Sequence, residues 1–252
     1  MHIDLNCDMG EGAGNDAAIM PFITSVNIAC GYHAGNEDTM RQTISLAIEN
    51  NVAIGAHPSF PDREHFGRRE MSLSAGEVYQ LVYEQLVILQ NIANESKAVL
   101  HHVKPHGALY NQAARQQDLA DAIVQAVKDF NSSLILVGLS GSCLITAAQH
   151  GGLKAASEVF ADRTYQDDGS LTPRTQPKAL IEDESESLRQ VLQMVRFGTV
   201  TATSGKTIPI AAETICIHGD GAQAAVFAQR IHAMLKENNI ELKRMTGDSS
   251  FE

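Results

Sequence analysis

Residues 52–56 (VAIGA), 74–93 (SAGEVYQLVYEQLVILQNIA) and 99–103 (VLHHV) decide the fold class. The first and last runs are short and apolar, which is typical of buried strands in a parallel sheet. The middle run begins with Ser74 and Glu77 at capping-box spacing and continues with apolar residues at helical spacing, so it predicts a helix. A strand, a helix and a strand in this order predict a right-handed βαβ unit and therefore a parallel sheet.

The same alternation extends towards both ends of the chain. Further strands are expected at residues 3–6, 25–29, 134–138, 155–160 and 214–218, and further helices at 39–50, 119–127, 142–150, 184–196 and 222–235. Residues 199–203 and 207–210, joined by a Ser-Gly-Lys turn, predict a β-hairpin inserted before the last strand. Seven parallel strands over this length fit either an incomplete barrel or a doubly wound sheet. No linker divides the chain, so residues 1–252 are interpreted as one domain.

Two local expectations follow from this pattern. His101 and His102 are neighbours in a predicted strand, so their side chains should point to opposite faces and at most one should enter the interior. The chain after Arg244 is polar, and we expect it to fray.

The charge balance excludes some classes of partner. There are 30 acidic and 19 basic residues, which gives a net charge of −11. Nucleic acid and anionic membranes would be repelled, whereas a small anionic substrate could still be held by a few local cations. The four cysteines form no C-x-x-C pair, which argues against a zinc knuckle or a redox motif. With no signal peptide and no apolar run of about 18 residues, the cytoplasm is the expected compartment.

Polar side chains follow at least six of the predicted strands. Because the carboxyl ends of parallel strands meet at one edge, these side chains should gather there. A single polar residue after a strand is ordinary turn chemistry, but six such strands predict an active site. The candidate catalytic residues are Asp8, His57, Lys104, His106, Asp162 and His218. The candidate substrate-binding residues are Asn6, Glu11, His33, Arg63, Arg68, Arg163 and Asp220.

Carboxylates beside imidazoles suit two kinds of chemistry. One is general acid–base catalysis, and the other is a divalent metal that activates water. Spacing does not choose between them, because the sequence has no H-E-x-x-H or similar motif. Lys104 and Arg163 would neutralise a substrate carboxylate or a developing oxyanion.

The sequence shows no nucleotide-binding loop. Gly205-Lys206-Thr207 resembles the end of a P-loop, but Val200 stands where the first glycine should be, and the context is a hairpin turn. No G-x-G-x-x-G run follows a strand either.

Six blocks, taken together and in order, resemble one known family. They are residues 4–11, 27–35, 55–58 with 66–69, 103–110, 158–163 and 217–220. This set is similar to the LamB/YcsF family over nearly the whole chain. The resemblance implies an α/β fold, an irregular parallel (β/α)7 barrel of the glycoside hydrolase/deacetylase type with a small inserted hairpin.

The resemblance also implies a hydrolase that acts on the C–N bond of a cyclic amide. The implied reaction is the ATP-dependent opening of 5-oxo-L-proline to L-glutamate, with 5-oxoprolinase subunits B and C as partners and ATP as co-substrate of the complex. Since no nucleotide loop is evident here, we hypothesise that B and C handle phosphorylation and that this chain performs ring opening. The alternatives are a stand-alone metal-dependent deacetylase or amidohydrolase, and a non-catalytic partner subunit. Whether a divalent metal is bound is left open.

Overall fold

The computed structural model describes residues 1–219 and 223–247. A barrel of parallel strands lies at its centre and is closed by pairing of β9 with both β6 and β1. Its strands, in spatial order, are β1 (His2–Met9), β2 (Ser25–Ala29), β3 (Ala53–His57), β4 (Leu100–Val103), β5 (Ile135–Leu139), β6 (Lys154–Phe160) and β9 (Thr214–Ile217). The short strand β10 (Glu241–Leu242) pairs with β1 outside the ring. The seven-stranded barrel is confirmed, and the doubly wound sheet is excluded.

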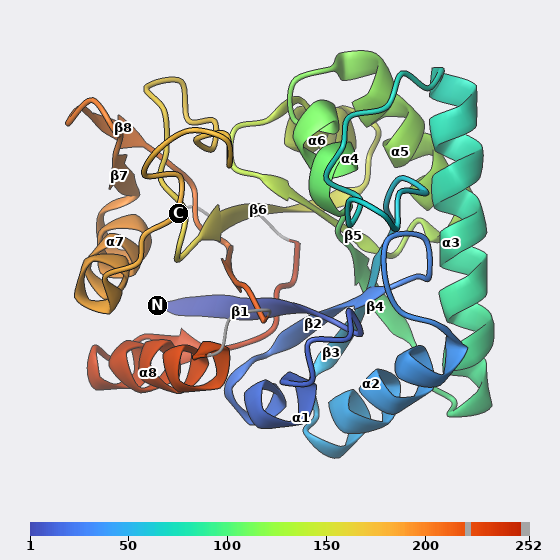
Figure 1. The fold of residues 1–252 in the computed structure, drawn as a ribbon, viewed down its shortest axis with the longest axis horizontal. Helices are drawn as coiled ribbons and strands as arrows, with labels where there is room; N and C mark the ends of the chain where they lie inside the picture. The colour runs from blue at the N-terminus through green and yellow to red at the C-terminus, as the bar shows by residue number, and fades with distance from the viewer. Residues whose placement is uncertain (220–222, 248–252) are drawn as a thin grey trace.

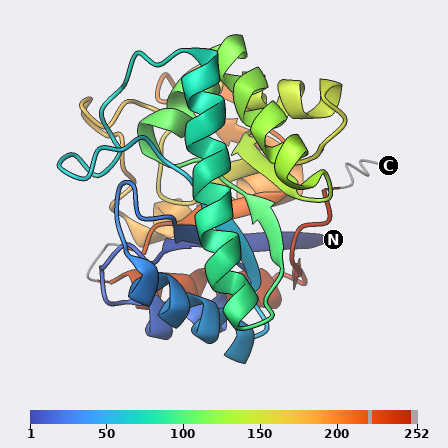
Figure 2. The same ribbon diagram turned by 90° about the vertical axis from the view of Figure 1, so that its right-hand side faces the viewer.

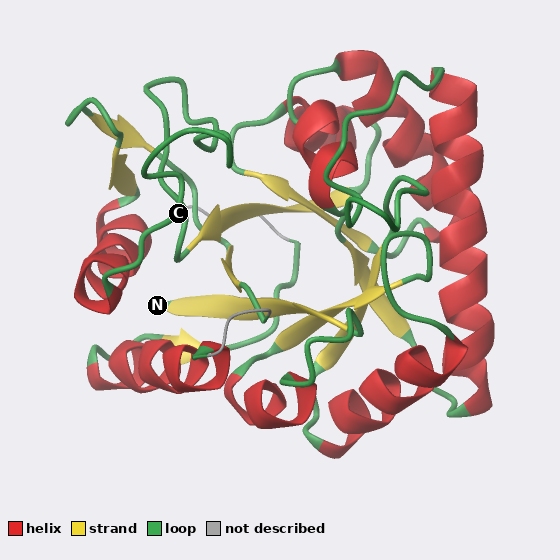
Figure 3. Ribbon diagram, viewed as in Figure 1, coloured by secondary structure: helices red, strands yellow, loops and turns green. Residues whose placement is uncertain are grey.

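Helices surround the barrel (Figures 1 and 3). They are α1 (Asp16–Ile19), the 3₁₀ helix η1 (Met20–Phe22), α2 (Glu37–Glu49), α3 (Ala75–Glu95), α4 (Gly107–Ala113), α5 (Gln117–Asn131), α6 (Cys143–His150), α7 (Glu184–Phe197) and α8 (Ala224–Glu237). The long α3 crosses one side of the barrel (Figure 2), and the expected capping box of Ser74 and Glu77 begins it. The short helices α1 and α4 were not expected. Among the described residues, no helix is both long and apolar enough to cross a membrane.

The predicted hairpin is present as β7 (Thr199–Thr201) and β8 (Thr207–Pro209), which pair antiparallel in a separate sheet. It follows α7 directly and lies beside it (Figure 1). Gly205 lies in the turn of this hairpin with φ of +90°. The partial P-loop match at Gly205 therefore lies in a hairpin turn, as the sequence predicted, and not between a strand and a helix.

Polar side chains fill much of the barrel interior. Asp4 accepts hydrogen bonds from Ser25 (2.6 Å) and Thr214 (2.5 Å) on two neighbouring strands. One layer above, Asn6 donates to Thr214 (2.6 Å) and to Glu158 of β6 (3.0 Å). Burial raises the pKa of Asp4 to about 6, even though its hydroxyl partners lower it. The strand β1 is longer than expected because its pairing with β2 and β9 continues past Asn6.

The two histidines of β4 do not alternate as expected. Strand pairing passes from Leu100 directly to His102, so His101 is the extra residue of a β-bulge. The two rings lie 5.5 Å apart, which corrects the prediction of opposite faces. Nε2 of His102 lies 2.8 Å from Oδ1 of Asn27 inside the barrel. A Cβ at Gly55 would lie 2.1 Å from that nitrogen, so glycine gives the ring its space.

The expectation that the chain frays after Arg244 is wrong for the first residue, Met245. Met245 is buried against Ile135, Val137 and Ala156 of β5 and β6, because these side chains leave an apolar space at the amino-terminal end of the barrel. Residues 248–252 lie outside the described residues.

Candidate active site

A cavity of about 810 Å³ lies at the carboxyl ends of the strands, where the sequence predicted an active site. Eight of the candidate residues line it: Asp8, Glu11, His57, Arg68, Lys104, His106, Arg163 and His218. Asp162 contacts a lining residue, whereas Asn6 and His33 are buried beside the lining. Asp220 lies outside the described residues.

Asp8 and Lys104 form a buried ion pair at the floor of this cavity. Nζ of Lys104 lies 2.9 Å from Oδ1 of Asp8, 2.9 Å from Oε1 of Glu158 and 3.1 Å from Sγ of Cys216. Burial alone would raise the pKa of Asp8, but His57 and Lys104 outweigh it and hold that pKa well below its usual value. An ammonium group has three hydrogen-bond donors, and these partners occupy them. Lys104 therefore holds the Asp8 carboxylate in place, and its contact with substrate stays a prediction.

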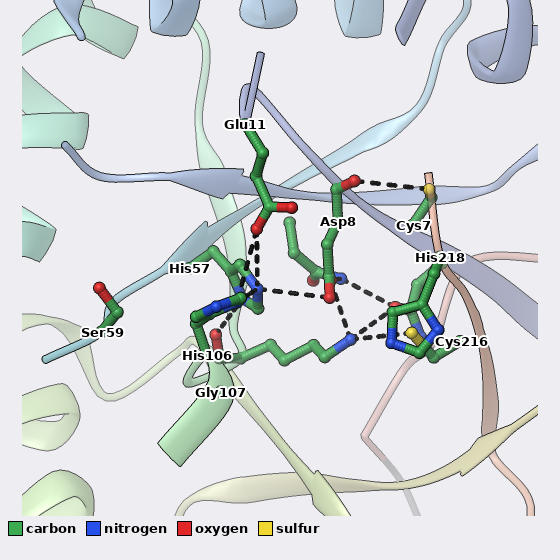
Figure 4. A network of polar contacts seen from close by, with 12 residues as sticks. Cys7, Asp8, Glu11, His57, Ser59, His106, Gly107, Cys216 and His218 are labelled. Carbon is green, nitrogen blue, oxygen red and sulfur yellow. Dashed lines mark hydrogen bonds and ion pairs between the residues drawn. The ribbon is translucent and has the colours of Figure 1, made fainter. Parts of the chain in front are cut away.

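His57, His106 and Glu11 meet on one side of Asp8 (Figure 4). Nε2 of His57 lies 2.9 Å from Nδ1 of His106, and Oε1 of Glu11 lies 3.4 Å from the latter. Burial and the facing His57 lower the pKa of His106 well below its usual value. Burial and the Asp8 charge raise the pKa of Glu11. Together with His33, these residues have ligand atoms within 4.8 Å of one another and could hold a metal ion.

The loop after β3 positions His106. The carbonyl of Phe66 accepts a hydrogen bond from Nε2 of His106 at 2.9 Å. Gly67 has φ of +63°, and a Cβ there would lie 2.9 Å from Cβ of His33 and 3.0 Å from Cδ2 of His106. At Gly107, a Cβ would lie 2.5 Å from the carbonyl oxygen of Gly67. The two glycines allow the loop to close on the histidine, which explains why both motif blocks contain one.

A second histidine system faces the cavity from the other side of Asp8. Nδ1 of His218 lies 2.7 Å from Oδ2 of Asp162, and its Nε2 lies 3.1 Å from Nη2 of Arg174. A guanidinium group only donates, so Nε2 accepts and Nδ1 carries the hydrogen given to Asp162. Burial would raise the pKa of Asp162, but His218 outweighs it and the pKa is lowered. The structure thus presents an imidazole oriented by a carboxylate, as in a general base.

Arg174 lines the cavity but was not among the predicted residues. It lies in the long connection between β6 and α7 rather than directly after a strand, so the strand-end rule does not detect it. Arg163, which was predicted, lies on the same wall and donates to the carbonyls of Ala179 (3.2 Å) and Thr172 (2.7 Å). Burial and the nearby Arg174 lower the pKa of Arg163 to about 10, so it is charged at neutral pH.

Three predicted substrate-binding residues, Asn6, His33 and Arg63, do not line the cavity. The Arg63 guanidinium donates to the carbonyls of Gly31 and Gly35 in the loop after β2, which directs it away from the lining. Asn6 is buried one layer below Asp8, because it precedes Asp8 by two residues on the same face of β1. In this structure Arg63 fastens a loop, and Asn6 belongs to the hydrogen-bonded interior.

Known proteins resemble this chain over nearly its full length. Residues 3–250 match the LamB/YcsF family. A Tolumonas auensis protein, named as the A subunit of 5-oxoprolinase, is 52% identical over 248 residues, covering 96% of this chain and 99% of that protein. A Bordetella parapertussis protein of the same name is 54% identical over 246 residues, covering 96% and 98%. The crystal structure of a lactam utilization protein from Thermus thermophilus matches with a TM-score of 0.90 and 40% identity, covering 96% and 99%.

These matches agree with the six sequence blocks, which lie within the matched residues. The Thermus thermophilus structure shares the fold over almost all of both chains. The resemblance drawn from the sequence is confirmed: the chain belongs to the LamB/YcsF family.

Proposed function

We propose that this chain acts as the A subunit of an ATP-dependent 5-oxoprolinase, which opens 5-oxo-L-proline to L-glutamate together with subunits B and C. Two relatives that are 52% and 54% identical bear the name of this subunit, which marks them as parts of a larger assembly. The observation that best supports a catalytic role is the contact of His218 with both Asp162 and Arg174, where His218 and Arg174 line the cavity.

In the proposed reaction His218 acts as the base. A water molecule at the lactam carbon gives a proton to Nε2 of His218, and Asp162 stabilises the imidazolium that forms. The C–N bond then breaks, and the proton passes from His218 to the ring nitrogen. Arg174 contacts Nε2 in this structure, so we expect the substrate carboxylate to draw its guanidinium away and admit water. Arg163, on the same wall, would help to hold that carboxylate.

ATP is assigned to the partner subunits. An unstrained amide is a poor electrophile, and phosphorylation of its oxygen would activate it for attack by water. Cleavage of the C–N bond then leaves an acyl phosphate, which a second water molecule hydrolyses to the carboxylate of glutamate and inorganic phosphate. This chain has no P-loop, so we place phosphorylation on subunits B and C and ring opening on this cavity.

The cytoplasm is the proposed compartment. The four cysteines of the chain are free thiols, which fits a reducing environment.

Reconstitution with omitted subunits tests the proposal. ATP loss and glutamate formation are measured separately for this chain alone, for B with C, and for all three. We expect glutamate only from the complete set, and complete ATP-coupled ring opening by B with C alone would refute the proposal. His218→Gln in the complete set should abolish glutamate formation, while His150→Gln, at the exposed end of α6, should not. Full activity of His218→Gln would favour the non-catalytic alternative.

A further inference from the structure

The hydrogen bonds of His57 and His106 fix which ring nitrogens carry hydrogen. Nδ1 of His57 lies 2.7 Å from the carbonyl oxygen of Lys104, and Nε2 of His106 lies 2.9 Å from that of Phe66. A carbonyl oxygen only accepts, so both of these nitrogens are donors. The remaining nitrogens, Nε2 of His57 and Nδ1 of His106, then carry lone pairs in the neutral rings, and they face each other at 2.9 Å. Two facing lone pairs repel unless a positive group lies between them.

Two carboxylates lie at the same point. Oε1 of Glu11 is 3.4 Å from Nδ1 of His106 and 3.9 Å from Nε2 of His57, and Oδ2 of Asp8 is 3.4 Å from Nε2 of His57. Lys104 binds Oδ1, the other oxygen of Asp8, and also Oε1 of Glu158. Its single positive charge is therefore shared between two carboxylates. Within the described residues, the groups at ion-pair distance from Glu11 are all histidines. In these ion pairs, Lys104 is one positive charge shared by Asp8 and Glu158, and the partners of Glu11 are imidazoles.

His33 is near this cluster but is not suited to share an ion with His106. Its ring is stacked on the His106 ring with centroids 3.8 Å apart and planes 5° from parallel. Because an imidazole lone pair lies in the ring plane, two such rings cannot both point at one ion. His57 and His106 have planes at 82°, which allows convergence. His33 instead lies 2.9 Å from Oε1 of Glu11 and orients that carboxylate.

A second group of potential ligands is less suitable. Asp8, Cys216 and His218 also lie near one another, with ligand atoms within 4.8 Å. The ammonium group of Lys104 lies 3.1 Å from Sγ of Cys216, and Nε2 of His218 accepts from Arg174. Two of the three ligand atoms are therefore occupied by cationic donors.

We propose that Asp8, Glu11, His57 and His106 bind one divalent transition-metal ion. Imidazole and carboxylate ligands together suit Zn²⁺, Co²⁺, Fe²⁺ and Mn²⁺. Nitrogen atoms 2.9 Å apart are close enough to share an ion at about 2.1 Å each. The carbonyls that accept from both rings are the outer hydrogen bonds that orient metal-binding histidines.

All four ligands line the cavity, so the ion would provide a Lewis acid there. The metal site is inferred from side-chain geometry and tested by metal binding. Its failure can therefore be distinguished from a failure of the proposed reaction.

Metal binding by the purified chain tests the site. The protein is stripped with a chelator and titrated with Co²⁺, following visible absorbance, and with Zn²⁺ by calorimetry. The variants are His57→Ala, His106→Ala and the isosteric Glu11→Gln, with His150→Ala as a matched exposed control. Circular dichroism checks that each variant is folded, and Glu11→Gln keeps the test valid if a histidine variant does not fold.

We expect about one ion per chain, with affinity reduced at least about 100-fold in every folded ligand variant and unchanged in His150→Ala. His33→Ala should retain the stoichiometry, because His33 only orients Glu11. A wild-type protein that binds no ion, which would leave a shared proton between the two rings, overturns the proposal. Binding with wild-type affinity in any folded ligand variant overturns it as well.

Discussion

Replacing Asp162 by Asn should slow ring opening strongly with little effect on folding. The two carboxylate oxygens lie 2.9 Å and 2.7 Å from Nδ1 of His218, and Asn can occupy the same space. When His218 takes a proton, its charge and the carboxylate charge are about 4 Å apart, which is worth about 4 kcal/mol at an effective dielectric constant of about 20. Loss of most of that stabilisation lowers kcat by about 10²- to 10³-fold.

The orientation of the side-chain amide in Asp162→Asn determines the largest loss of kcat that is expected. If the amide oxygen faces Nδ1, the tautomer is retained and only the charge is lost. If the amide nitrogen faces Nδ1, the hydrogen moves to Nε2, the ring cannot accept a proton from water, and the loss approaches about 10⁴-fold, as in serine proteases.

The assay is the initial rate of glutamate formation by the reconstituted complex, with ATP consumption recorded in parallel. Asp168→Asn is the matched control, because Asp168 also lines the cavity but its carboxylate bonds Ser170. Its kcat should stay within about threefold of wild type. A kcat for Asp162→Asn within about threefold of wild type would refute the assignment of His218 as the base.

Three further predictions test other parts of the structure. Arg174→Met should raise KM for 5-oxo-L-proline by about 30-fold, from the loss of about 2 kcal/mol of ion pairing, and an unchanged KM would contradict the carboxylate role. Gly67→Ala, with φ of +63° and a new Cβ at 2.9 Å from His33 and 3.0 Å from His106, should lower the free energy of unfolding in urea by about 1–3 kcal/mol, and an unchanged midpoint would be inconsistent with this close packing. Asp4 has a folded-state pKa of about 6 against an ordinary 3.8, so its contribution to stability is full at low pH and is lost as pH rises through 6. The stability of Asp4→Asn relative to wild type should therefore increase by about 1 kcal/mol between about pH 5 and pH 8. A decrease would contradict the raised pKa of the buried Asp4 carboxyl group.

The sequence could predict the features that depend on local pattern. The capping box of Ser74 and the apolar spacing after it specify α3, because burial on one helical face fixes the period. The rule that parallel strands end at one edge placed His57 and His218 at the same cavity before any contact was known.

Features that depend on partners distant in sequence could not be predicted. The end of β1 at Met9 depends on pairing with β2 and β9, so Asp8 is a strand residue rather than a loop residue. The bulge at His101 depends on the register between β3 and β4. Arg174 reaches His218 through a connection with little regular structure, and no local pattern in the sequence reports that contact.

A structure with 5-oxo-L-proline bound is the most direct test of the proposed site. We expect the substrate carboxylate to contact Arg174 or Arg163, with a water on Nε2 of His218 within about 3.5 Å of the lactam carbon. A lactam ring bound outside the cavity, or with its carbonyl carbon remote from His218, would contradict the account.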